Sequence, residues 1–217
     1  MKSAKPIVQQ EDLAPTEYCL NRELSWLAFN ERVLAEALNP AHPLLERLRF
    51  LSISDSNLDE FYMVRVAAYK SDLTPDIAKI SVHGQSNSDL LKQIAFVAGK
   101  LIEGQARTWR LLRQELKGEG FEILDVTDLS ETETQWLENY FRINIFSTLS
   151  PLAIDPAHPF PWIPNRGLAI AFTLRNEKTG KITHEILSVP SMIQRFVRIP
   201  APVYRFVPLE QVIANNI

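Results

Sequence analysis

The sequence predicts an α+β fold, in which an all-helical domain precedes a mixed α/β domain that is incomplete within this chain. As far as Lys117, apolar residues recur every three or four positions, as they do in amphipathic helices. After Gly118, short apolar runs alternate with turn residues, which is typical of strands. The chain stops soon after a last helix begins. We therefore expect a flexible tail over 1–16, a helical domain over 17–117 and a truncated α/β domain over 118–217.

The composition is that of an ordinary soluble protein. The 217 residues carry a formal net charge of −3, so no overall charge draws the chain to nucleic acid or to acidic membranes. Cys19 is the only cysteine, which excludes a disulfide framework. The opening "MKSAKPIVQQEDLAP" lacks the apolar core of a secretion signal, and no apolar run is long enough to cross a bilayer. We expect a cytoplasmic protein with no transmembrane segment and no nucleic-acid partner.

Three segments of the first half have helical spacing. The first, "NRELSWLAFNERVLAEA", has Asn21 as a candidate N-cap, and its apolar stripe is wide enough to predict packing on two sides. The stripe consists of Leu24, Leu27, Ala28, Leu34, Ala35 and Leu38, widened by Trp26, Phe29 and Val33. A second helix begins at Pro43. The third and longest spans about Ser88–Leu116 and ends at Gly118 and Gly120. The polar "TPDIAKISVHGQSNS" between the second and third is predicted to be a mobile loop.

The second half alternates strand-like and helical segments. "FEIL", "GLAIAFTLR", "ITHEILSVP", "RFVRIP" and "VYRFVPL" have the composition of strands, and "NEKTGK" joins the second and third as a hairpin loop. Ser130 and Glu133 form a capping box that opens a helix over "TQWLENYFRINIF". The proline-dense "SPLAIDPAHPFPWIPN" is predicted to lack regular structure. "PLEQVIANNI" begins a last helix, and we expect its apolar residues Leu209, Val212 and Ile213 to stay unburied because no further element follows.

The stretch "SDSNLDEFYMVR" places many polar residues just before an apolar segment. Asp55, Asn57 and Asp59 alternate as in the opening of an EF-hand calcium loop. Such a loop then needs a glycine and, at its twelfth position, a glutamate, but Glu60 and Val66 occupy those positions. The sequence therefore excludes a calcium loop of this type.

The same residues are typical of a helix start. Ser56 or Asn57 is suited to cap a helix, and Asp59 and Glu60 would complement the positive end of its dipole. The stretch nevertheless offers more cap-competent residues than one helix needs. A spare Asn57 beside aromatic residues has both an amide donor and a carbonyl acceptor for a planar heterocycle. Capping and ligand binding both stay open at this point.

No other pattern in the sequence indicates catalysis or a metal site. "TGK" at 179–181 lacks the upstream glycine of a phosphate-binding loop, and Gly118 and Gly120 lack the third glycine of a dinucleotide fingerprint. The four histidines are scattered, and with a single cysteine they form no zinc pattern. We assign no catalytic residue and no metal ligand.

Three motifs, in order, carry a resemblance to a known family. "LNRELSWLAFNERVLAEA", "PLLERLRFLSISDSNLDEFYMVRVA" and "PLAIDPAHPFPWIPN" together resemble polyphosphate kinase, the bacterial type that extends polyphosphate from ATP. The likeness runs from about Tyr18 to the C-terminus. It implies a helical N-terminal domain, an α/β head domain and two C-terminal catalytic domains related to the phospholipase D fold. This chain resembles the N-terminal domain and part of the head domain.

The resemblance implies one functional contribution from this chain. The asparagine of the "SNLDEF" motif, here Asn57, contacts ATP near its adenine, and the phenylalanine of "RLRFL", here Phe50, lies beside the adenine ring. The phosphohistidine, the magnesium ligands and the basic polyphosphate tunnel of the family belong largely to its C-terminal half, so none of the four histidines here takes that role. By the same resemblance, "AHPFPW" is a structural connection into the head-domain sheet.

Two kinds of function follow. The resemblance implies part of a kinase that acts reversibly on ATP and polyphosphate, with magnesium bound by domains outside this chain. It also implies a homo-oligomer joined through the head domain, located in the cytoplasm or peripherally at the inner membrane. The alternative is a stand-alone interaction module that does not bind ATP, and a reading frame that continues past Ile217 into a histidine-bearing half would favour the kinase. In either case we expect the 217 residues alone to transfer no phosphate, because that reaction needs positive groups or metal ions around the phosphate.

Overall fold

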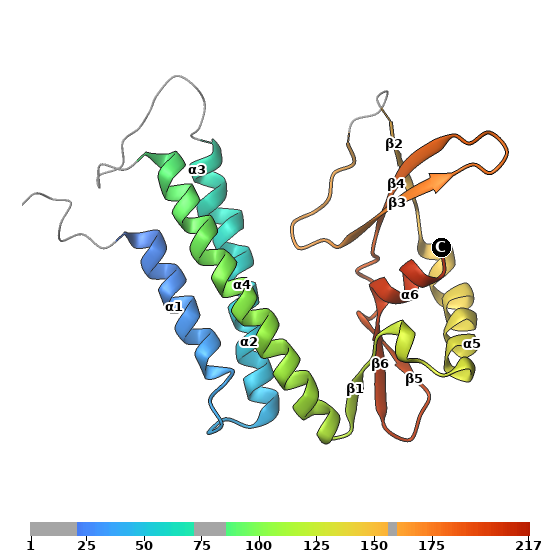
Figure 1. Ribbon diagram of the computed structural model, residues 1–217, viewed down its shortest axis with the longest axis horizontal. Coiled ribbons are helices and arrows are strands. Elements are labelled where there is room, and N and C mark those ends of the chain that lie inside the picture. The colour runs from blue at the N-terminus through green and yellow to red at the C-terminus, as the bar shows by residue number, and fades with distance from the viewer. Residues whose placement is uncertain (1–20, 72–85, 156–159) are drawn as a thin grey trace, which may run out of the picture. The chain divides into compact units, whose positions relative to one another are not determined.

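The computed structural model describes residues 21–71, 86–155 and 160–217, and it has the predicted α+β architecture (Figure 1). The chain divides into two compact units, which we call the helical unit (1–112) and the sheet unit (113–217). Each unit has its own hydrophobic core. The tail predicted for the N-terminus lies outside the described residues.

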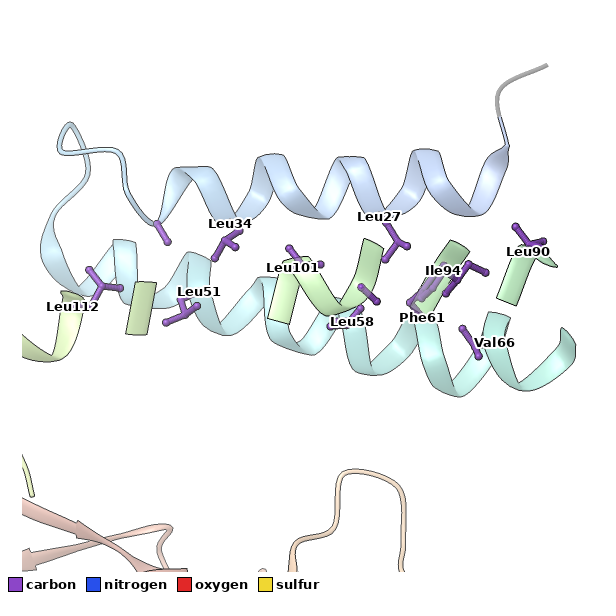
Figure 2. Packing of buried hydrophobic residues seen from close by; sticks show 12 residues of the cluster. Leu27, Leu34, Leu51, Leu58, Phe61, Val66, Leu90, Ile94, Leu101 and Leu112 are labelled. Atoms are coloured by element: carbon purple, nitrogen blue, oxygen red, sulfur yellow. The ribbon is translucent and has the colours of Figure 1, made fainter. Parts of the chain in front are cut away.

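The helical unit is built around three long helices. Its elements are α1 (Arg22–Glu36), α2 (Leu44–Glu60), α3 (Ala67–Ser71) and α4 (Asn87–Gly118), the last of which continues past the unit boundary. A π-helical segment, Phe61–Val66, joins α2 to α3 without a break. Figure 1 shows α1, α2 and α4 side by side, and Figure 2 shows their apolar side chains converging between them. This converging layer, which includes Leu27, Leu58 and Ile94, is the core of the unit.

Helix α1 begins at an N-cap and buries one narrow stripe of residues. The predicted N-cap is confirmed, because the Asn21 side-chain oxygen accepts hydrogen bonds from the N–H groups of Glu23 and Leu24 at 2.9 and 3.2 Å. The predicted packing on two sides is wrong. The buried residues are Glu23, Leu27, Asn30 and Leu34. Phe29 and Leu38 are each 47% exposed, since single apolar residues can face water at little cost and widen a stripe in the sequence without widening the core.

The longest helix agrees with its prediction. α4 has 32 residues and contains all of Ser88–Leu116. The buried residues of its stripe include Ile94, Ala98, Leu101, Gln105, Leu112 and Leu116. The helix ends at Gly118, and Gly120 has a φ of 81°, a left-handed conformation that glycine adopts most readily. Most of the loop predicted before α4 falls in 72–85, outside the described residues.

The sheet unit contains two three-stranded sheets. Its strands and helices are β1 (Phe121–Ile123), α5 (Glu131–Tyr140), β2 (Leu152–Ile154), β3 (Ala169–Arg175), β4 (Ile182–Ser188), β5 (Phe196–Ile199), β6 (Tyr204–Pro208) and α6 (Leu209–Asn215), with 3₁₀ or π turns at Val126–Asp128, Phe141–Ile145 and Phe146–Thr148. In the sheet ordered β1-β6-β5, β6 is parallel to β1 and antiparallel to β5. In the sheet ordered β2-β4-β3, both outer strands are antiparallel to β4.

Most predicted elements of the sheet unit are confirmed. All five predicted strands form, with β3 and β4 as the predicted hairpin. Ser130 caps α5, and its backbone N–H donates to the Glu133 carboxylate at 2.9 Å, which completes the capping box. The proline-dense segment was predicted to lack regular structure, but Leu152–Ile154 forms β2 and pairs with β4. These three residues lie between prolines, so their N–H groups are free to join a ladder. Residues 156–159 of that segment lie outside the described residues.

The last helix is buried, contrary to its prediction. Leu209, Val212 and Ile213 of α6 are fully buried. They belong to the core of the sheet unit, together with Ile199 of β5 and Val207 of β6. Because β6 leads directly into α6, the helix turns back over the sheet that precedes it and needs no later element to cover its apolar face.

Candidate functional site

The polar stretch of the sequence lies inside a helix. α2 runs without a break through the stretch and into the π-helical segment. Ser56 and Asn57 therefore cap no helix, and Asp59 and Glu60 lie in the last turn of α2 rather than in a first turn. The capping interpretation is wrong because polar groups of this stretch, among them those of Ser54 and Asn57, hydrogen-bond to other helices instead of to a local helix end.

These bonds form a buried network across α1, α2 and α4. The Asn57 amide donates to Asn30 Oδ1 at 3.3 Å, and the Asn30 amide donates to the Ser54 backbone carbonyl at 2.9 Å. From α4, Gln105 donates to the Ser54 hydroxyl at 3.0 Å. Asn30 and Ser54 are fully buried. Asn30, Ser54 and Gln105 were not among the site residues predicted from the sequence. An amide at a core position of an apolar stripe is the signal that could have found the network.

The structure brings the two predicted site residues, Phe50 and Asn57, onto one face of α2. They are seven positions apart on a continuous helix, which is about two turns and about 10 Å along its axis. Both are partly buried, and Ile53, on the same face between them, is 40% exposed. We call this partly open surface of Phe50, Ile53 and Asn57 the α2 face. A planar ligand that contacts both ends of it must lie along the helix rather than across it.

Asn57 keeps hydrogen-bonding capacity on the α2 face. A carboxamide has two donor hydrogens and an acceptor oxygen. One hydrogen is directed to Asn30, and within the described residues the side-chain oxygen of Asn57, Oδ1, accepts no hydrogen bond. One donor and one acceptor are therefore left for a ligand.

The aromatic end of the α2 face is held by the turn that precedes α2. The ring centroids of Phe50 and His42 lie 5.0 Å apart at an interplanar angle of 38°. His42 Nε2 lies 2.8 Å from a carboxylate oxygen of Glu36. Hydrogen bonds from the Asn39 side chain, first, and from His42 lower the pKa of Glu36. His42 thus positions the Phe50 ring and has its own partner in Glu36.

A partly buried ion pair fixes the start of α1 to the helical segments that follow α2. Arg65 Nη1 lies 3.4 and 3.2 Å from the two carboxylate oxygens of Glu23, and the Tyr69 hydroxyl donates to the same carboxylate at 3.3 Å. Burial raises the pKa of Tyr69, and the nearby negative charge of Glu23 raises it further. Arg65 and Tyr69 both donate to the Glu23 carboxylate, so these three side chains stabilise the fold and do not indicate a binding site.

Two cavities in the described part of the chain are lined by other residues. One, of about 330 Å³, is lined mainly by residues of α1 and α4, including Leu34, Lys100 and Arg107. The other, of about 380 Å³, lies in the sheet unit and is lined mainly by apolar residues, with Glu185 as its acidic group. Within the described residues, no group of three or more histidine, cysteine, aspartate or glutamate side chains could hold a metal ion. Every helix described is too short or too polar to cross a membrane.

Comparison with known proteins matches nearly the whole chain to one family. The family models are the polyphosphate kinase N-terminal domain, at residues 19–124, and the polyphosphate kinase middle domain, at residues 132–217. Polyphosphate kinases of Erythrobacter litoralis and Synechocystis sp. are 44% and 41% identical over 97% and 100% of this chain. The chain spans only 30% and 31% of their lengths. The crystal structure of polyphosphate kinase from Porphyromonas gingivalis matches with a TM-score of 0.77 and 28% identity, over 90% of this chain and 29% of that one.

The two matched domains follow the two halves of the fold. The N-terminal match contains α1 to α4 and β1, and the middle-domain match contains nearly all of α5 and every later element. The motifs of the sequence and both family models thus agree, and the resemblance is confirmed. The chain therefore belongs to the polyphosphate kinase family.

Proposed function

We propose that this chain is the N-terminal part of a polyphosphate kinase that reversibly transfers the terminal phosphate of ATP to polyphosphate. In this proposal the α2 face forms one wall of the adenine site. Phe50 offers an aromatic surface to the ring, and the Asn57 amide offers a donor and an acceptor to its edge. The observation that supports the proposal most is that both residues share one partly open face of a continuous helix.

The proposal assigns the phosphate chemistry to residues outside this chain. The α2 face carries no charged side chain, so it suits a neutral heterocycle and not a transferring phosphate. The curated relatives are about three times as long as the chain. We place the phosphohistidine and the magnesium ligands in that remaining length, and the homo-oligomer contact in the sheet unit. A cytoplasmic location, or a peripheral one at the inner membrane, belongs to the same proposal and agrees with the single cysteine.

Substitution of Asn57 tests the adenine wall. In the full-length enzyme, we expect Asn57→Ala to raise the KM for ATP by about 2- to 12-fold, which corresponds to the loss of a hydrogen bond of about 0.5–1.5 kcal/mol. The kcat should change little, because in this proposal no reacting phosphate touches Asn57. The measurement is the initial rate of polyphosphate synthesis at varied ATP concentration.

Asn30→Ala is the matched control. It removes the same Asn30–Asn57 hydrogen bond but leaves the Asn57 amide on the α2 face. A rise in KM for Asn57→Ala without a rise for Asn30→Ala supports direct contact with ATP. An equal rise for both variants would mean that Asn57 acts through packing, and an unchanged KM for Asn57→Ala would rule out the adenine wall.

A further inference from the structure

We propose that Asn30, a buried residue of α1, sets the nucleobase specificity of the α2 face by holding the Asn57 amide in one orientation. This role rests on the proposed function, because it concerns the same adenine wall, and it makes Asn30 a positioning residue that touches no ligand. Asn30 is fully buried, whereas Asn57 is partly buried and has one donor and one acceptor left for a ligand. The order in which these two groups face the ligand decides which base they fit.

Hydrogen-bonding chemistry determines the orientation of both amides. The Ser54 backbone carbonyl can only accept, so the Asn30 side chain must direct its nitrogen to it, at 2.9 Å. The Asn30 side-chain oxygen also only accepts. It lies 3.3 Å from the Asn57 nitrogen and requires that nitrogen as its donor. A half-turn of the Asn57 amide would place two oxygens against each other at a site that Asn30 and Ser54 bury.

The α2 face therefore presents the Asn57 oxygen and its second N–H group in a fixed order. Turning both amides together is no escape, because the Asn30 oxygen would then face the Ser54 carbonyl. Ser54 is fully buried, so water cannot replace the lost donor at little cost. Only one arrangement of the pair gives every contact a donor and an acceptor.

The fixed order suits adenine and not a 6-oxo purine. Along the edge formed by position 6 and N1, adenine has an amino donor followed by an acceptor. Hypoxanthine and guanine have the reverse, an oxygen acceptor followed by an N–H donor. In this proposal that edge faces Asn57, because there the two kinds of base exchange donor and acceptor and a locked amide distinguishes them. An amide that is free to turn would pair with either base.

Selection by a fixed amide also requires a base that cannot shift past it. The Phe50 ring lies against His42, with ring centroids 5.0 Å apart, and His42 Nε2 lies 2.8 Å from Glu36. The aromatic end of the α2 face is thus held in place, and Asn57 follows about two turns further along the helix. Phe50 sets the position of the base, and Asn30 sets which hydrogen-bonding groups that base meets.

Nucleotide selectivity of the full-length enzyme tests the lock. ATP and inosine triphosphate are the probes, because they differ only at position 6 and N1 of the base. In Asn30→Ala, we expect the ratio of kcat/KM for ATP to that for inosine triphosphate to fall by about 2- to 12-fold, the effect of one hydrogen bond. The KM for ATP should rise by no more than about twofold, because the released amide still spends part of its time in the orientation that fits adenine.

Ser54→Ala is the matched control. It removes the hydrogen bond that Gln105 donates to the Ser54 hydroxyl, but it keeps the backbone carbonyl that orients Asn30. Its ratio should equal that of the unmodified enzyme. The ratio does not depend on the amount of folded enzyme, so a loss of stability leaves it unchanged. Asn30→Leu also lacks the amide oxygen and fills the space, so it gives the same measurement if Asn30→Ala does not fold.

Asn57→Ala separates failure of the lock from failure of the adenine wall. Support for the lock is a ratio that falls in Asn30→Ala and in Asn57→Ala, with no further fall in the double variant, because Asn30 acts only through the Asn57 amide. If Asn57→Ala raises the KM for ATP while both Asn30 variants keep the parent ratio, the wall stands and the lock is overturned. An equal fall in Ser54→Ala also overturns the lock, since packing then explains it. If Asn57→Ala changes neither quantity, the wall fails and the lock fails with it.

Discussion

The helical unit and the sheet unit are held together by different kinds of core. In the helical unit, polar residues are buried among the apolar ones: Glu23, Asn30, Ser54, Gln105 and Thr108. In the described part of the sheet unit, every buried residue is apolar. The buried amides of the helical unit bond to Ser54, and its buried carboxylate is paired with Arg65. These partners offset most of the desolvation cost of burying the polar groups. Apolar residues at the same positions could give similar stability, so the presence of polar residues there has another explanation.

This difference shows how the helices of one unit, and the strands of the other, are held in one alignment with their neighbours. An apolar stripe that repeats every three or four residues can slide by one turn against its neighbour and still bury leucine against leucine. The bonds from Asn30 and Gln105 to Ser54 can form in one alignment only. In the sheets, a slip of one residue turns every side chain to the opposite face, so the ladder itself sets the register. We infer that the Asn30 network specifies helix alignment, whereas no such device is needed in the sheet unit.

The largest expected effect comes from truncating an apolar side chain in the sheet unit. Ile213 of α6 is fully buried, and Ile213→Ala should lower the free energy of unfolding of this unit by about 2–5 kcal/mol, the usual cost of such a change in a core. Hydrogen exchange followed by mass spectrometry reports on each unit separately. We expect faster exchange across 113–217, with 1–112 nearly unchanged. Asn215→Ala, at an exposed position of α6, is the control, and lost protection in both units would contradict separate cores.

The features that could be predicted from the sequence are local ones. The Asn21 cap, the capping box of Ser130 and Glu133 and the stripe of α4 depend on residues a few positions apart, and all of them form. Five described strands of the sheet unit were equally predictable, because short apolar runs between turn residues indicate them directly, but β2 in the proline-dense segment was missed. The family and the fold class followed from motifs that were also local.

The features that could not be predicted depend on contacts distant in sequence. The polar stretch looked like a helix start because nothing nearby shows that Asn30, 24 positions before Ser54 and 27 before Asn57, lies opposite it. The burial of α6 was missed for the same reason, since its partners are in earlier strands. For the candidate site, the resemblance named Phe50 and Asn57. Their position on one helix face follows only from the continuity of α2, whereas the sequence pattern predicted a new helix start at Ser56 or Asn57.

The next largest effect tests the polar core of the helical unit. Asn30→Ala should lower the free energy of unfolding of this unit by about 1–3 kcal/mol, because the buried Ser54 carbonyl and the partly buried Asn57 amide lose a partner. Urea unfolding, read by hydrogen exchange in 1–112, measures the loss. Glu31→Ala, at the exposed neighbouring position, should change stability by no more than about 0.5 kcal/mol.

A fully apolar version of the network separates stability from alignment. The triple variant Asn30→Leu, Ser54→Ala and Gln105→Leu replaces the three buried polar side chains by apolar ones. As in Asn30→Ala, the Ser54 backbone carbonyl and the Asn57 amide lose Asn30 as a partner, but the added apolar side chains fill the core. If the network specifies alignment, this variant should be as stable as the parent chain yet give more than one set of amide signals by nuclear magnetic resonance. A stable variant with a single set of signals would refute that role.

The smallest effect concerns pH and the sheet unit. The Glu133 carboxylate accepts from the Ser130 backbone N–H and hydroxyl and pairs with Arg205. The backbone bond from Ser130, first, and then the hydroxyl and Arg205 hold the pKa of Glu133 below its ordinary value of 4.5. A carboxyl group whose pKa is lowered by folding adds stability above the ordinary value, and that stability is lost as pH falls from about 4.5 through the lowered pKa. In the helical unit, Glu36 and Asp89 also have lowered pKa values, but their side chains are 45% and 60% exposed, so solvent screens their bonds more.

Glu133→Gln should therefore cost the sheet unit about 1 kcal/mol at neutral pH and nothing at acid pH. Glutamine reaches the same donors without the charge, which accounts for the modest loss at pH 7. Once Glu133 is protonated in the parent chain, the two side chains make nearly the same bonds, and the two stabilities should converge. Urea unfolding at a series of pH values measures this, with Glu131→Gln, at an exposed position in the same first turn of α5, as the control. A stability difference that stays constant from neutral to acid pH would show that Glu133 acts through shape and not through its charge.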